Sequence, residues 1–138
     1  MTAACVLDTD VVIAALDRRD AHHADAEQAI TAMIDAEVGL LLSLVNYAET
    51  LVRPAESDET MRAVLDALNA LGIRLVAPTA AIAREAARHR ARDISLADGF
   101  AIATAHARGA SLASFDPRVR RALPAAGVEL APVLAAQP

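Results

Sequence analysis

The sequence predicts a single-domain α/β protein, an α/β/α sandwich in which helices cover both faces of a central parallel sheet of four to five strands. Two observations predict this fold class. Short apolar runs alternate with helical patterns along the chain, and signals for the start and end of helices lie between them. Strands of this kind are typical of parallel sheets that are buried on both faces. A chain of 138 residues is long enough to bury one such core.

Two predicted strands and three helices make up the first half of the chain. Residues 4–7 are an apolar strand that ends at Asp8, and residues 39–42 are a second one. Ser43 is placed to cap the helix that follows the second strand, and Pro54 is placed to end it. The helices between the two strands are expected at residues 9–17 and 21–37.

The second half continues the alternation of helix and strand. A helix begins at Ser57 or Asp58 and is ended by Gly72, and Asp116-Pro117 is a strong signal for the start of another helix. The remaining elements are strands at residues 73–76, 110–115 and 128–130 and helices at residues 79–92 and 95–108.

The composition indicates one domain without a membrane segment. Hydrophobic residues make up 55% of the chain, but no apolar run approaches the roughly 18 residues that suggest a membrane span. The N-terminus has no basic region before its apolar stretch, unlike a secretory signal, and the single Cys5 cannot form an internal disulfide. We therefore expect a domain over residues 1–130, a flexible tail over residues 131–138 and a cytoplasmic location.

Four acidic residues lie where the pattern calls for apolar side chains. Asp8 and Asp116 follow apolar strands, and Asp98 interrupts a helical segment that is apolar on all sides. Glu49 lies within a further apolar run, residues 44–52. Each acid alone has an ordinary explanation, such as a helix cap at Asp116 or an exposed helix flank at Glu49. Because burying an unpaired carboxylate is expensive, the four together indicate a cation site.

The expected place of this site is beyond the carboxyl ends of the strands, where ligands bind in open parallel sheets. Oxygen ligands without a cluster of His or Cys favour Mg²⁺, or Mn²⁺, over zinc. The corresponding chemistry is hydrolysis of a phosphate ester by a metal-activated water. A formal net charge of −5 is weak evidence against a nucleic-acid substrate, because these four acids contribute −4 and leave −1 for the rest of the chain.

The same residues lie in four short motifs. The motifs are Val6-Leu7-Asp8-Thr9-Asp10, Leu42-Ser43 with Ala48-Glu49, Leu96-Ala97-Asp98-Gly99 with Ala103 and Ala105, and Ser114-Phe115-Asp116. In order and spacing this set resembles the PIN-domain ribonucleases, and the bacterial VapC toxins most closely. The resemblance covers nearly the whole chain. It implies a PIN-like fold and an endoribonuclease toxin that uses Mg²⁺ or Mn²⁺, is inhibited by a cognate VapB-like antitoxin and forms a homodimer.

The resemblance also implies roles for individual residues. The catalytic and metal-binding acids of the family match Asp8, Glu49, Asp98 and Asp116. Ser114 matches a small hydroxyl residue two positions before the last acid, which is expected to support a ligand or a water. Thr9 and Asp10 are expected to support the site without binding metal directly. Gly99 stands where the family usually has alanine.

Arginine supplies all 13 basic residues of the chain. Arg84, Arg88 and Arg92 recur at helical spacing, and Arg118 follows Asp116. A solvated helix face is the ordinary interpretation, and the functional hypothesis is contact with RNA phosphates or with an acidic antitoxin segment. Because the chain has one Tyr, two Phe and no Trp, we do not expect stacking of bases on aromatic rings to be a major source of binding.

Two other functions fit parts of the pattern. Asp8-Thr9-Asp10 after a buried strand also matches the start of haloacid-dehalogenase-type phosphatases, in which Asp8 would be a nucleophile. That chemistry usually needs a lysine, which this chain lacks, and it leaves Glu49 and Asp98 without a role. The second alternative is a PIN-like fold that binds RNA or a partner without cutting, and the intact set of acids argues against it.

Overall fold

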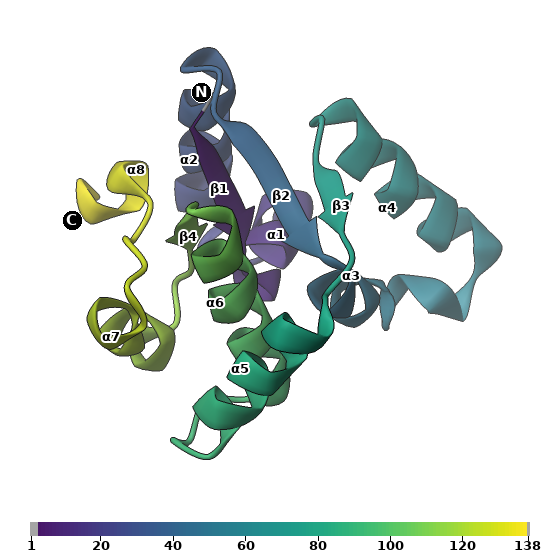
Figure 1. The fold of residues 1–138 in the computed structure, drawn as a ribbon. Coiled ribbons are helices and arrows are strands. Elements are labelled where there is room, and N and C mark those ends of the chain that lie inside the picture. The colour runs from purple at the N-terminus through teal and green to yellow at the C-terminus, as the bar shows by residue number, and fades with distance from the viewer. Residues whose placement is uncertain (1–2, 138) are drawn as a thin grey trace.

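The computed structural model describes residues 3–137 and is built around one parallel sheet (Figure 1). Its strands are β1 (Ala4–Leu7), β2 (Gly39–Ser43), β3 (Arg74–Val76) and β4 (Ser111–Ala113), in the spatial order β3-β2-β1-β4. Val6 of β1 lies opposite Leu41 of β2 and Leu112 of β4. The predicted α/β fold with a parallel sheet is confirmed.

Helices connect every pair of consecutive strands. The helices between β1 and β2 are α1 (Thr9–Leu16) and α2 (His23–Asp35). Those between β2 and β3 are α3 (Leu44–Leu51), the short 3₁₀ helix η1 (Pro54–Glu56) and α4 (Asp58–Ala70). Those after β3 are α5 (Ala80–Arg90), α6 (Leu96–Arg108), α7 (Pro117–Ala126) and α8 (Pro132–Ala135). No helix within residues 3–137 has the length and apolar character needed to cross a membrane.

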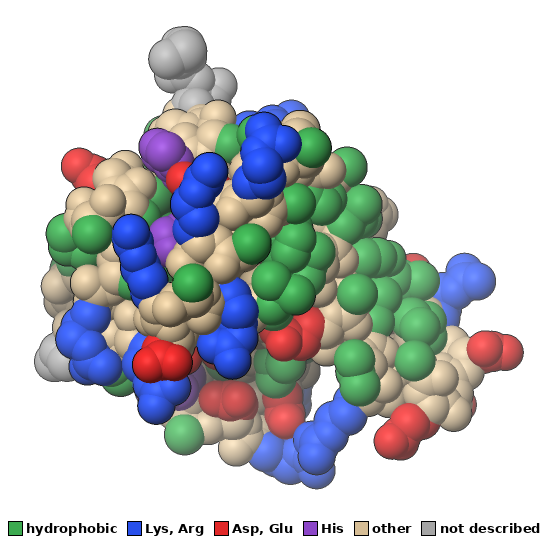
Figure 2. All heavy atoms as spheres, turned by 60° about the horizontal axis from the view of Figure 1, so that its bottom comes forward, with side chains coloured by type: hydrophobic (Ala, Val, Ile, Leu, Met, Phe, Trp, Pro, Cys, Tyr) green, Lys and Arg blue, Asp and Glu red, His purple; other side chains and the backbone are tan. Residues whose placement is uncertain are grey.

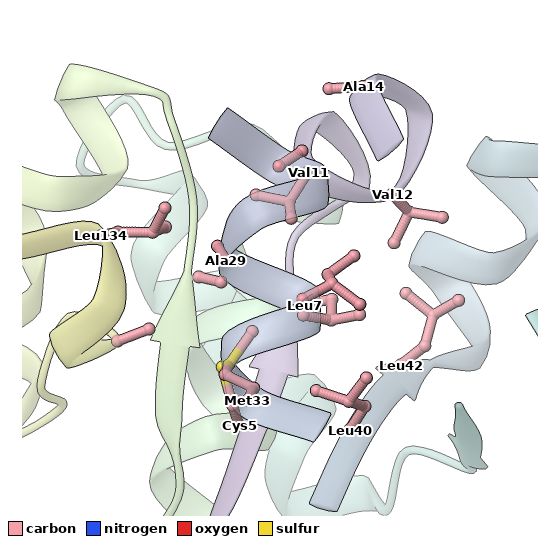
Figure 3. Close-up of a cluster of buried hydrophobic side chains, with 14 of the residues drawn as sticks. Cys5, Leu7, Val11, Val12, Ala14, Ala29, Met33, Leu40, Leu42 and Leu134 are labelled. Atoms are coloured by element: carbon pink, nitrogen blue, oxygen red, sulfur yellow. The ribbon is translucent and has the colours of Figure 1, made fainter. Parts of the chain in front are cut away.

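Alternate residues of the strands face two separate cores. Cys5, Leu7 and Leu42 pack against residues of α1 and α2 in one core (Figure 3), whereas Val6 and Leu41 pack against α6 and α7 in the other. Because both faces of β1 and of the middle of β2 are covered, Ala4–Leu7 and Leu40–Leu42 are continuous apolar runs. Burial raises the pKa of the Cys5 thiol to about 11, as expected for an unreactive buried cysteine.

The sheet has a topological switch point between β1 and β4. The chain places β2 and β3 on one side of β1 and then crosses through α5 and α6 to add β4 on the other side. Ligands of open α/β sheets bind at such a switch point, outside the carboxyl ends of the strands. Asp8 follows β1 and Asp116 lies shortly after β4, so both acids are delivered to this position by the topology.

Gly99 allows α5 and α6 to pack closely. A Cβ atom at residue 99 would lie 2.9 Å from the carbonyl oxygen of Ala86 and 3.3 Å from the Cβ of His89. An alanine at this position would therefore push the two helices apart. The departure from the family pattern at Gly99 thus has a packing reason.

The C-terminal segment differs from the prediction. Within the described residues, the predicted strand at residues 128–130 contributes only an isolated parallel bridge between Leu130 and Leu112. The expected flexible tail, residues 131–138, instead contains α8 as far as the structure describes it, to residue 137. Ala131 and Leu134 are buried in the core that holds Cys5. This burial of apolar surface keeps the segment on the domain.

Candidate functional site

Asp8 is a buried carboxylate at the end of β1, with an exposed fraction of 1%. The backbone N–H of Thr9 donates to its Oδ1 at 2.9 Å, and the hydroxyl of Ser114 donates to its Oδ2 at 2.8 Å. Burial, followed by repulsion from Asp10 and Asp98, raises the pKa of Asp8 to about 8. The side chain is therefore held rigidly in a place where its negative charge is costly.

Asp10 lies in the first turn of α1 and is also largely enclosed. Its Oδ2 accepts a hydrogen bond of 3.0 Å from the N–H of Phe115, whereas its Oδ1 is buried without a hydrogen-bond partner. Burial raises the pKa of Asp10 to about 6 in spite of the hydrogen bonds, and Asp98 and Asp116 add to the shift. An unsatisfied buried oxygen of this kind requires an explanation, and a bound cation would supply one.

Asp98 and Asp116 are both half-buried and are held at the starts of helices. The N–H of Asp98 donates to the hydroxyl of Ser95, which caps α6, at 3.2 Å. Asp116 caps α7 by accepting a hydrogen bond of 2.8 Å from the N–H of Arg118, and its own N–H donates to Ser114 at 3.2 Å. Negative charge is favoured at these positions by the helix dipole.

The structure brings four aspartates into one site at the switch point of the sheet. Asp8 is repelled by Asp10 and Asp98, and Asp10 is repelled by Asp98 and Asp116. Ser114 connects the two strand ends through its bonds to Asp8 and to the N–H of Asp116. Asp10, which the sequence predicts as a supporting residue, thus interacts through its charge with Asp8, Asp98 and Asp116.

Glu49 lies apart from these aspartates. Its side chain is exposed on α3, where it lines a groove of about 670 Å³ with Ile13, Val52 and Val64. The structure therefore does not place it with the four aspartates, and its part in metal binding remains a prediction. The residue of α3 that faces the site is Asn46.

Asn46 is fully buried and ties α3 to α1 and α6. Its Nδ2 donates to Oγ1 of Thr9 at 3.0 Å and to the carbonyl oxygen of Ala97, beside Asp98, at 3.2 Å. Thr9, next to Asp8, is thereby joined to α3, and its supporting role stays a prediction. Sequence reasoning missed Asn46, although a polar side chain one helical turn before Glu49 in an apolar run was an available signal.

The four aspartates fit a hard divalent cation. Within residues 3–137, no three acidic, His or Cys side chains converge closely enough to enclose a metal ion by themselves. Mg²⁺ commonly uses only one or two carboxylates and keeps several waters, so this looser arrangement suits it. A cation would also pair with Oδ1 of Asp10 and offset the repulsion that raises the pKa of Asp8.

The predicted arginines do not all lie on one surface. Arg88 of α5, Arg92 in the turn after α5 and Arg118 of α7 line a groove of about 960 Å³, and Arg121, which the prediction omitted, joins them. Arg84 is exposed on α5 and is not part of the lining. Figure 2 shows arginine side chains gathered on one side of a group of acidic side chains, with a broad hydrophobic surface on the other side.

A stacked pair of rings lies beside the aspartates. The ring centroids of His22 and Phe115 are 4.4 Å apart and their planes differ by 10°. Phe115 is fixed there by the bond from its N–H to Asp10, and it directly precedes Asp116. His22 is exposed at the N-cap of α2, yet its side chain makes no capping hydrogen bond. Its ring instead stacks on the ring of Phe115.

A protein-family model matches most of the chain. Residues 5–122 match the family model of the PIN domain. No curated protein matches the chain.

Several solved structures are similar in fold. VapBC2 from Rickettsia felis, bound to a DNA fragment from its promoter, has a TM-score of 0.71 at 16% identity over 92% of this chain and 96% of that chain. A toxin–antitoxin complex from Klebsiella pneumoniae has a TM-score of 0.69 at 19% identity, over 87% and 92%. VapC20 from Mycobacterium tuberculosis, a toxin that cleaves the sarcin-ricin loop, has a TM-score of 0.66 at 21% identity, over 86% and 94%.

Proposed function

Because the chain belongs to the PIN domain family, we propose that it is a divalent-metal-dependent endoribonuclease of the VapC type, a toxin inhibited by a cognate antitoxin. The observation that carries this proposal is the meeting of Asp8, Asp10, Asp98 and Asp116 at the switch point of the sheet. Buried carboxylates that repel one another and leave one oxygen unpaired are suited to a cation, and a cation of this kind is suited to phosphate chemistry.

In this proposal, Asp8, Asp98 and Asp116 hold Mg²⁺, or Mn²⁺, and Glu49 is a further ligand. When bound, the metal supplies a nucleophilic water at neutral pH and neutralises charge on the phosphate oxygens. The protein contributes rigidity, because the bond from Ser114 orients the Asp8 side chain, the N–H of Arg118 orients that of Asp116, and the cap of α6 fixes the backbone of Asp98. The hydrogen bonds of Asp8 and Asp116 support their roles, whereas the role of Glu49 rests on the family resemblance alone.

The phosphatase hypothesis gains no support from the structure. A nucleophilic Asp8 would have to reach the phosphorus atom of a substrate. Asp8 is 1% exposed, and its two oxygens already accept hydrogen bonds from Thr9 and Ser114. A group so enclosed is a better ligand or positioning residue than a nucleophile.

The groove beside Glu49 is the place we propose for the antitoxin. Ile13, Val52 and Val64 line it, Val52 is 71% exposed, and Arg19 and Arg53 lie at its edge. An apolar peptide segment with acidic residues would cover the groove and reach Glu49. We expect Val52→Asp to abolish binding of the antitoxin co-expressed with it while RNA cleavage persists; retained binding would contradict this assignment.

A homodimer is also part of the proposal. Three large leucines, Leu44, Leu75 and Leu96, are exposed on α3, β3 and α6. Burial of such residues between two copies is a common source of dimer stability. Light scattering of the purified chain tests this, and a monomer mass at every concentration would contradict it.

The ribonuclease proposal is tested with purified protein that is free of antitoxin. We expect cleavage of cellular RNA with Mg²⁺ or Mn²⁺, no cleavage with EDTA, and a loss of at least about a hundredfold in Asp98→Asn. Asp66→Asn, which changes an exposed aspartate of α4, is the matched control and should behave like the wild type. Absence of cleavage by the wild type with either metal would remove the main support for the enzyme.

A further inference from the structure

The groove between α5, α6 and α7 concentrates positive charge next to the aspartate site. Arg88 approaches it from α5 and Arg92 from the turn after α5, and Arg118 and Arg121 approach it from α7. All four side chains are exposed, and among the residues that the structure describes none of them forms a salt bridge. Converging guanidinium groups repel one another unless an anion lies between them.

The groove stays positive after its own acids are counted. Glu85 and Asp93 also line it, so four guanidinium groups and two carboxylates leave a charge of +2 with neutral histidines. Glu85 is already engaged, because its Oε1 lies 2.6 Å from Nδ1 of His106. The arginines therefore remain available to an external anion.

His89 adds a buried polar group to the same groove. It is 9% exposed, and its Nε2 is buried without a hydrogen-bond partner. Burial lowers the pKa of the ring, which favours the neutral form. A buried polar atom without a partner is rare in folded proteins, and a phosphate oxygen in the groove would accept a hydrogen bond from it.

We propose that this groove binds the phosphate backbone of single-stranded RNA to one side of the cleavage site, an inference that rests on the proposed ribonuclease function. Arg118 connects the groove to the aspartates, since it lines the groove and its N–H bonds to Asp116 at 2.8 Å. A strand whose scissile phosphate lies at the aspartates would place its next phosphates among the arginines. The planar fork of arginine matches phosphate oxygens in geometry and charge.

An acidic protein segment is the competing occupant of the groove. RNA is favoured because four guanidinium groups line this groove, whereas Ile94 is the one large apolar side chain among its lining residues and the other apolar ones are alanines. The apolar groove beside Glu49, built from different elements, is better suited to a peptide.

The test measures binding of a short single-stranded oligoribonucleotide over a series of salt concentrations. All proteins are full-length and carry Asp98→Asn, so that the RNA is not consumed, and Mg²⁺ is present. For Arg92→Gln with Arg121→Gln we expect about tenfold weaker binding at low salt. The slope of log K against log salt should shrink by about 1.4, because each phosphate contact to a single strand contributes about 0.7. Arg62→Gln with Arg108→Gln, the same charge change outside the groove, should keep the slope of the parent protein.

A second variant, His89→Phe, tests the buried ring separately. Phenylalanine keeps an aromatic ring but removes Nε2, so we expect roughly fivefold weaker RNA binding. The salt slope should not change, because no full charge is removed. A change in slope in this variant would contradict a neutral donor at His89.

The possible outcomes distinguish a failure of the groove assignment from a failure of the ribonuclease proposal. If the wild type cleaves RNA but the arginine pair binds RNA like its control, the ribonuclease stands and the groove assignment is wrong. If the arginine pair loses binding to the antitoxin and keeps its affinity for RNA, the groove belongs to an acidic protein segment, and the assignment is again wrong. If the wild type neither binds nor cleaves RNA, both proposals fail.

Discussion

The hydroxyl of Ser114 donates a hydrogen bond of 2.8 Å to Oδ2 of Asp8, and both side chains are buried. The same oxygen of Ser114 accepts a hydrogen bond of 3.2 Å from the N–H of Asp116. One small side chain thus joins the ends of β1 and β4, the two strands that flank the switch point. It fixes the position of one aspartate and the backbone of another.

We expect Ser114→Ala to lower the free energy of unfolding by about 1–3 kcal/mol, because it leaves a buried carboxyl group and an N–H without their partner. RNA cleavage should fall as well, since Asp8 loses its orientation. Ser111→Ala, at the other end of β4, removes only a weak contact of 3.5 Å to the carbonyl of Ala4 and is the control. Equal activity of the two variants would show that Ser114 does not position the site.

The raised pKa values of Asp8 and Asp10 predict how stability depends on pH. In the native state these values are about 8 and about 6, whereas the ordinary value is 3.8. Between about pH 4 and pH 8 the native protein holds protons that the unfolded chain has released. The free energy of unfolding of the metal-free protein should therefore fall as pH rises through this window.

Denaturant titration of the metal-free protein at several pH values measures this slope. Asp8→Asn should flatten it, and Mg²⁺ should restore stability at about pH 8, because the ion binds the deprotonated native state. A metal-free protein whose stability rises from about pH 5 to pH 8 would contradict the predicted sign.

Asn46 is expected to matter for both stability and cleavage. Asn46→Ala removes the bonds to Thr9 and to the carbonyl of Ala97, which hold α3 against α1 and α6. The free energy of unfolding should fall by about 2 kcal/mol, and RNA cleavage should fall with it because Ala97 precedes Asp98. Asn69→Ala, an exposed asparagine of α4, is the matched control. An Asn46→Ala protein as stable as this control would show that the bonds contribute nothing.

The stacked pair of His22 and Phe115 offers a flat surface for a base next to the aspartates. Stacking of a base on an aromatic side chain contributes about 1–3 kcal/mol, so His22→Ala should raise KM for RNA at least about fivefold with little change in kcat. His22→Phe should keep the wild-type KM, since it preserves the ring. If His22→Phe and His22→Ala raise KM equally, the ring is not a platform for a base.

The sheet and the caps could be predicted because their signals are local. A strand buried on both faces is a continuous apolar run, and Ser43, Thr79 and Asp116 cap helices where the sequence places them. The positions of Asp8 and Asp116 at the ends of parallel strands followed from the same reasoning. The helix α8 could not be predicted, because Ala131 and Leu134 are too few to form a periodic pattern and their burial depends on the distant Cys5 core.

The rest of the site depends on tertiary packing. Apolar and polar residues are mixed around Glu49, so the sequence could not decide which face of α3 turns toward the aspartates, and Asn46 occupies that face. The contact between His22 and Phe115 joins the N-cap of α2 to the segment after β4, and the local sequence around neither residue predicts it. The groove that collects Arg121 with Arg92 likewise exists only where α5 and α7 meet.

Mapping of RNA ends after induced expression tests most directly whether the aspartate site cuts RNA. Cells that express the wild type should accumulate new RNA ends at defined positions, and cells that express Asp98→Asn at the same level should not. Growth arrest by the wild type without new RNA ends, or the same ends with Asp98→Asn, would contradict the claim.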